Sequence, residues 1–167
     1  MNRPDAAQIG TSHNWLIQPW YSQLFVDGDS PPSNANLYPE AAGVLSACEG
    51  SRLAIFTSST GIEVRVCMES WTAEPRITDH HAEDGPDTAT IDVPAGKITL
   101  WTEESVEFDL PEPGKYIVQV TGHNRESTEQ ALLRAQDRSR DFDDPQFQAD
   151  LATLTGREFY VLRFWPA

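Results

Sequence analysis

The chain has few basic residues and no long apolar run, and each shortage excludes a class of protein. Only 12 Lys and Arg stand against 26 Asp and Glu, so the formal net charge is -14. Such a charge repels nucleic acid and anionic membranes, and it attracts basic partners. No apolar run approaches the ~18 residues of a membrane span, and the N-terminus lacks the layout of a signal peptide. We therefore expect a soluble, cytoplasmic protein with no nucleic-acid or membrane partner.

Cysteine is also scarce, because Cys48 and Cys67 are the only two in 167 residues. Two thiols beside apolar residues predict buried free cysteines rather than a disulfide framework. The length suits one domain with a single core. Residues 1–13 carry no pattern and are predicted to be disordered, which leaves 14–167 as the domain.

Alternating apolar and polar residues recur between turn residues, a pattern that predicts antiparallel β structure. In GIEVRVCME, Gly61 to Glu69, the apolar set faces one way and the charged residues face the other. SVEFDL, Ser105 to Leu110, repeats the alternation, and PEPG then turns the chain into KYIVQV, Lys115 to Val120. Weaker candidate strands cover 15–18, 20–27, 52–57, 89–93 and 97–101.

The last third of the chain changes character before a final strand. Helix formers fill about 125–155, where Ser127 or Thr128 is a candidate cap, and PQFQADLATL starts a second helix at Pro145 and ends before Gly156. REFYVLRFW, Arg157 to Trp165, is apolar on both faces, as a central or covered strand would be. The predicted fold is all-β: an antiparallel β-sandwich of about eight strands with a helical insertion before the last strand.

Four segments carry a resemblance to a known family. They are NWLIQPWYSQLFVDGD, AAGVLSACEGSRLAIFTSSTGIEVRVCMESWTAEP, SVEFDLPEPGKYIVQVTGHNR and EFYVLRFWPA. Their order resembles that of the ComJ-like inhibitors of the DNA-entry nuclease of bacterial competence, and of related uncharacterised small bacterial β-sandwich proteins. The likeness to the inhibitors covers roughly Trp15 to Gly122, and the insertion and last strand follow the uncharacterised set. The resemblance implies an acidic β-sandwich that binds and blocks a nuclease, and the same layout fits an immunity protein against a toxin.

A metal site is the first alternative, because ITDHHAEDGPD places two histidines among four acids. Adjacent residues on an extended chain point to opposite sides, so only one of His80 and His81 could join Asp79, Glu83 or His123 at an ion. No HExxH spacing is present, and Gly-Pro marks a loop. We therefore expect a polar connection and no metal or other cofactor, with a small metal-dependent hydrolase using these histidine loops as the alternative.

Calcium and carbohydrate binding form the second alternative. DGD at 27–29 and DFDD at 141–144 offer hard oxygen ligands, but neither continues into an EF-hand. Five tryptophans could line a sugar-binding face, although aromatics in a small sandwich more often fill the core. These are Trp15, Trp20, Trp71, Trp101 and Trp165. His123 and Arg125, where a strand gives way to a loop, lack a partner at a catalytic spacing, so we predict no enzyme.

Outward carboxylates are the preferred candidate site. A rigid sheet holds such groups at fixed spacing, so they could imitate a run of phosphates to a cationic cleft. An ordinary solvated sheet face would look the same. The predicted partner-binding residues are Glu63, Glu69, Glu103, Glu104, Glu107, Asp109 and Asp84. The sequence thus predicts a non-enzymatic inhibitor or immunity protein whose partner is a basic nuclease or toxin.

Overall fold

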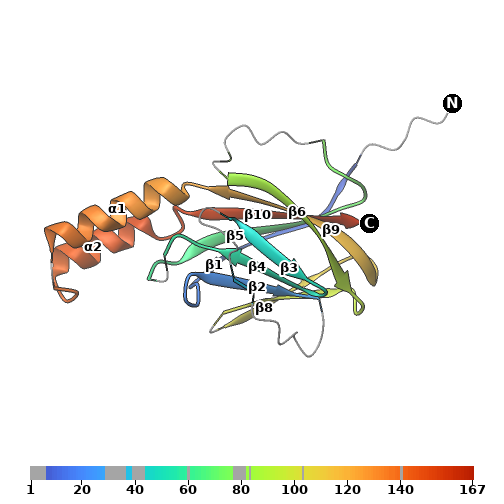
Figure 1. Ribbon diagram of the computed structural model, residues 1–167, viewed down its shortest axis with the longest axis horizontal. Coiled ribbons are helices and arrows are strands. Elements are labelled where there is room, and N and C mark those ends of the chain that lie inside the picture. Colours follow the sequence, from blue (N-terminus) through green and yellow to red (C-terminus); the bar gives the residue numbers. More distant parts are fainter. Residues whose placement is uncertain are drawn as a thin grey trace.

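The computed structural model describes residues 7–28, 37–38, 44–59, 61–76, 82, 84–102, 104–139 and 141–167. Within these ranges the chain forms ten strands and two helices (Figure 1). The strands are β1 (Ile9–Ile17), β2 (Gln23–Asp27), β3 (Ser46–Glu49), β4 (Arg52–Phe56), β5 (Val64–Trp71), β6 (Asp84–Val93), β7 (Lys97–Trp101), β8 (Ser105–Asp109), β9 (Gly114–His123) and β10 (Phe159–Pro166). The helices are α1 (Arg125–Arg138) and α2 (Pro145–Leu154). Neither helix is long and apolar enough to cross a membrane.

The strands form two five-stranded sheets, ordered β1-β5-β10-β9-β6 and β3-β4-β2-β7-β8. Their pairs are antiparallel except for β10 and β5, which run parallel. The all-β class with a helical insertion is confirmed. The prediction of about eight wholly antiparallel strands is wrong, because the described part of the chain contains ten strands and one sheet is mixed. Residue alternation reports which face is buried and carries no signal for strand direction.

One hydrophobic core joins the two sheets. In β5 the alternation appears as predicted, since Val64, Val66 and Met68 are buried while Arg65 is exposed. From the other sheet, Leu100 and Phe108 belong to the same cluster. β10 lies third of five strands in its sheet and contributes side chains buried on both faces, which matches its two-sided apolar sequence.

The two sheets also meet along both of their edges. On one side Asp87 of β6 accepts hydrogen bonds from the backbone N and the Oγ of Ser46 on β3, at 3.0 and 3.1 Å. On the other side the rings of His13 and Trp15, from β1, pack on Phe108 of β8 at centroid distances of 5.9 and 6.3 Å. The short strand β3 was not predicted from the sequence, because four residues show too little alternation.

The helices form a hairpin that projects from one end of the two-sheet body (Figure 1). α2 starts at Pro145 as predicted, and Asp144 caps it by accepting a hydrogen bond from Gln146 N at 2.8 Å. The predicted cap of α1 is wrong. β9 continues to residue 123, and the left-handed Asn124 (φ 58°) then starts the helix, so Thr128 lies buried inside α1.

Candidate partner-binding surfaces

A buried polar cluster fixes the base of the helical hairpin. Glu158, between α2 and β10, is only 1% exposed. Its carboxylate accepts hydrogen bonds from Ser58 N at 2.9 Å, from Ser58 Oγ and from the hydroxyl of Tyr160. Burial, together with the Glu158 charge, raises the pKa of Tyr160 well above its usual range. The groups satisfy one another, so the cluster acts as a structural anchor.

A second set of contacts holds the start of α1 in the same region. Arg125 Nη1 donates to Asp84 Oδ2 at 2.8 Å, and its Nη2 donates to the Phe56 carbonyl at 3.0 Å. Asp84 begins β6 and Phe56 ends β4, so one guanidinium ties both sheets to the helix. Asp84, a predicted binding residue, is therefore engaged within the molecule, with a side chain 31% exposed.

Glu69 is also engaged within the molecule. Its Oε2 accepts from the indole nitrogen of Trp71 at 3.0 Å and from Arg163 Nε at 3.1 Å, and its side chain is 17% exposed. The partner Arg163 lies 94 residues away in sequence. Because the ion pair forms across β5 and β10, no local pattern could have revealed it.

Three of the predicted acids are exposed on β8 or just before it. Glu107 and Asp109 lie on β8, at the edge of its sheet, and Glu104 directly precedes the strand. Glu107 accepts a hydrogen bond from Lys97 Nζ on β7 at 2.9 Å, in a pair that is open to solvent. These three residues form what we call the β8 acid row. Charges on an edge strand also prevent edge-to-edge aggregation, so their presence has a structural use as well.

Glu63 lies apart from the β8 acid row. It is exposed and precedes β5, and its carbonyl accepts a hydrogen bond from Gly156 N at 2.8 Å near the helical hairpin. Glu103 lies outside the described residues. The predicted acids that the structure describes thus lie on, or next to, strands of both sheets.

The histidine loop falls mainly outside the part of the chain that the structure describes, including Asp79, His80, His81 and Glu83. His123 is described, and it is buried with its ring stacked on Phe159 at a centroid distance of 4.1 Å. Among the described residues no group of three or more His, Cys, Asp or Glu side chains could hold a metal ion.

The two candidate calcium loops use their carboxylates for other contacts. Both oxygens of Asp27 bind Arg52, at 2.8 and 2.9 Å, and Asp29 lies outside the described ranges. In the second loop Asp144 caps α2, and Asp141 Oδ1 accepts from Asp143 N at 3.0 Å. A calcium ion at either loop would have to displace these partners.

The cysteines offer little nucleophilic chemistry. Cys48 and Cys67 are free and half-buried. Burial is the main cause that raises the pKa of each thiol. Both therefore stay protonated near neutral pH, whereas a catalytic cysteine needs its thiolate.

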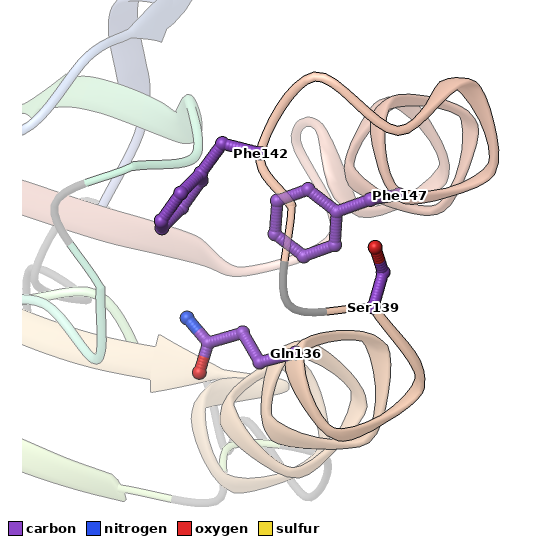
Figure 2. A pocket seen from close by; sticks show the side chains of 4 residues that line it. All are labelled: Gln136, Ser139, Phe142 and Phe147. Carbon is purple, nitrogen blue, oxygen red and sulfur yellow. The ribbon is translucent and has the colours of Figure 1, made fainter.

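The tip of the helical hairpin holds a small pocket of about 260 Å³ (Figure 2). Phe142 and Phe147 face it with ring centroids 5.5 Å apart, and Gln136 and Ser139 complete its lining. Phe142 is 70% exposed, and its carbonyl accepts a hydrogen bond from Gln148 at 2.6 Å. This apolar spot was not predicted from the sequence, because the acids of DFDD indicate oxygen ligands rather than an apolar surface.

These features define the structural class of the protein: two β-sheets around one core, with a helical hairpin inserted before the last strand. Among solved structures the chain is similar to ComJ from Bacillus subtilis, described as an inhibitor of the DNA degrading activity of NucA. The TM-score is 0.57 at 13% identity, and the match covers 96% of this chain and 98% of that one. A second similar structure is the product of crocagin biosynthetic gene J, with a TM-score of 0.50, 16% identity and the same coverage.

The chain therefore has the ComJ-like fold that its sequence motifs implied. The structural match to ComJ covers more of the chain than Trp15 to Gly122, the stretch over which the sequence likeness to the inhibitors runs. No family model and no curated protein matches the sequence.

Proposed function

We propose that this chain is a non-enzymatic inhibitor or immunity protein that binds and blocks a basic nuclease or toxin. The observation that carries the proposal is the match in fold to ComJ over nearly the full length of both chains, since ComJ inhibits a DNA-degrading nuclease. The net charge of -14 supports it independently, because a nuclease must present a positive surface to DNA.

The β8 acid row, Glu104, Glu107 and Asp109, is the proposed electrostatic contact. Glu107 and Asp109 are exposed on a strand whose ladder with β7 fixes their spacing, and exposed Glu104 directly precedes that strand. Glu107 and Asp109 are two residues apart and point to the same side, about 7 Å from each other. A fixed row of negative charge would steer a basic protein during association and would weaken as salt screens it. Glu63 adds an exposed carboxylate at the helical end.

Inhibition of DNA digestion tests the proposal directly. The purified chain is immobilised and used to capture proteins from an extract of the cells that produce it. Eluted proteins are then assayed for digestion of plasmid DNA with and without added chain. We expect a basic nuclease that elutes at high salt and that a stoichiometric amount of the chain inhibits. Failure of the chain to inhibit any captured nuclease, and NucA as well, would reject the proposal.

Charge reversal tests where the electrostatic contact lies. Glu104→Lys, Glu107→Lys and Asp109→Lys together should slow association with the nuclease by about 10-fold or more at low salt, because steering is lost. The matched control replaces three exposed acids of the helical hairpin with lysine and changes the net charge equally. These are Glu129, Asp137 and Asp143. Equal slowing by both triple variants would show that net charge alone matters and that the β8 acid row has no special part.

A further inference from the structure

The turn between β1 and β2 has an unusual backbone. Trp20 and Gln23 exchange two backbone hydrogen bonds, each 3.0 Å long, around a loop of two residues. Tyr21 and Ser22 form that loop with φ angles of 48° and 59°, so both are left-handed. Two-residue loops of this type favour Asn-Gly or Gly-Gly, because side chains with a Cβ are strained there. A tyrosine at this position is therefore disfavoured by local geometry.

The same turn exposes two aromatic side chains. Tyr21 is 76% exposed and Trp20 is 51% exposed. Their rings meet edge to face with centroids 5.1 Å apart, so each restricts the other. Ser22 O accepts a hydrogen bond from Thr57 N at 2.9 Å, which fixes the turn to the residue after β4. The rings are thus presented to solvent on a rigid support.

Strain and exposure both cost stability, and neither improves the core. Residues held in the left-handed region persist where the surroundings impose them, and they concentrate at binding and active sites. Trp and Tyr are also enriched among the few residues that dominate protein interfaces, since they bring a large contact area with little entropy to lose. Together these two observations point to a contact surface.

We infer that Trp20 and Tyr21 form an aromatic anchor that holds cationic side chains, Arg or Lys, of the basic protein partner. The inference rests on the proposed function and adds a second contact, distinct from the β8 acid row. Aromatic faces attract cations, and the chain's charge of -14 disfavours a second copy of itself as the occupant. Exposed Glu63 lies at the same end, beside Val64, which pairs with Ile17 three residues before Trp20.

The location fits a surface that a large partner can reach. The turn, drawn in blue between β1 and β2, lies at the end of the two-sheet body from which the helices project (Figure 1). Leu16, also at this end, is 51% exposed and approaches Gly156 just after α2. Leu16 and Glu63 thus add an exposed apolar side chain and an exposed carboxylate at the same end of the body as the anchor.

The test measures inhibition of the captured nuclease by variants of the full chain. Tyr21→Ala and Trp20→Ala should each raise the half-inhibitory concentration by at least about 10-fold, mainly through faster dissociation. Tyr38→Ala removes another tyrosine that is 69% exposed, and it should change inhibition less than about 2-fold.

Two further variants separate binding from folding. Ser22→Gly keeps both rings and relieves the backbone, so inhibition should stay as in the wild type while the melting temperature rises. Tyr21→Asn suits the left-handed position but removes a ring, so it should fold at least as stably and still lose inhibition. A loss of inhibition without a loss of stability cannot come from misfolding.

The outcomes distinguish the anchor from the function on which it rests. If the wild type inhibits the nuclease and Tyr21→Ala and Trp20→Ala inhibit it equally well, the anchor is refuted and the inhibitor function stands. A weakening by Tyr38→Ala equal to that by Tyr21→Ala would also refute it, because any exposed tyrosine would then have served. A wild-type chain that inhibits no nuclease overturns both.

Discussion

Replacing Arg52 with alanine should lower the free energy of unfolding by about 3–5 kcal/mol, because it leaves a buried carboxylate without its cation. Asp27 on β2 is 0% exposed. Arg52 on β4 donates to it from Nε to Oδ1 at 2.9 Å and from Nη2 to Oδ2 at 2.8 Å, in a bidentate pair. Truncating Arg52 removes both hydrogen bonds and keeps the cost of burying the Asp27 charge.

The two single variants should differ. With Asp27→Ala the Arg52 guanidinium keeps its position over the Phe25 ring, 5.0 Å from the centroid, and its side chain is 13% exposed. The Phe25 ring and the remaining solvent contact therefore still stabilise the Arg52 cation, so Asp27→Ala should lower the free energy of unfolding less than Arg52→Ala does. The double variant should cost less than the sum of the singles, since the second truncation removes a charge that the first left unpaired.

Urea unfolding followed by tryptophan fluorescence gives the free energies. A loss of about 3–5 kcal/mol corresponds to a fall in melting temperature of roughly 6–20 °C for a chain of this size. The control is Lys97→Ala, whose ion pair with Glu107 is exposed on both sides and should leave stability nearly unchanged. A loss below about 1 kcal/mol for Arg52→Ala, or a loss equal to that of the control, would refute the reasoning.

Three further changes should affect stability. Tyr160 has a raised pKa in the folded state, so its protonated hydroxyl stabilises the fold fully below the ordinary tyrosine pKa of 10.0. This stabilisation is lost as pH rises above that value, so Tyr160→Phe should flatten the alkaline fall in melting temperature. Ser22→Gly should raise the free energy of unfolding by about 0.5–1 kcal/mol, because the relief of the left-handed backbone strain exceeds the conformational entropy that a glycine loses on folding. An unchanged melting temperature would show that the turn is not strained. Glu158→Ala should lower the free energy of unfolding in urea by about 2–4 kcal/mol, because Ser58 N loses its hydrogen-bond acceptor. The control is Glu129→Ala, at an exposed position, and equal effects of the two variants would contradict the structural role of Glu158.

The elements that sequence reading placed well have strong local signals. The alternation from Ile62 to Met68 matches β5, and Pro145 followed by a helical pattern and Gly156 matches α2 and its end. Burial on one face and proline or glycine chemistry depend on neighbours within a few residues. The start of α1 was misplaced because Asn124 begins the helix from a left-handed conformation, without a capping side chain.

The candidate site was less accessible to sequence reading, because its properties depend on distant partners. Glu69 and Asp84 were expected to offer free charge, yet Arg163 and Arg125 bind them across strands. Their role in binding a partner stays a prediction, as does that of Glu104 and the rest of the β8 acid row. Tyr21 carried no sequence signal, since a tyrosine in a loop is ordinary until its backbone angle and exposure are known.

The sequence by itself determined the sign of the charge, the alternating faces of the strands, and the helical insertion before an apolar last strand. These properties follow from composition and from residues close together in the chain. Tertiary structure decided which carboxylates remain exposed, that β10 runs parallel to β5, and that two aromatic rings are exposed on a strained turn. Each of these depends on which remote segments become neighbours, and that pairing is fixed only when the two sheets close around a shared core.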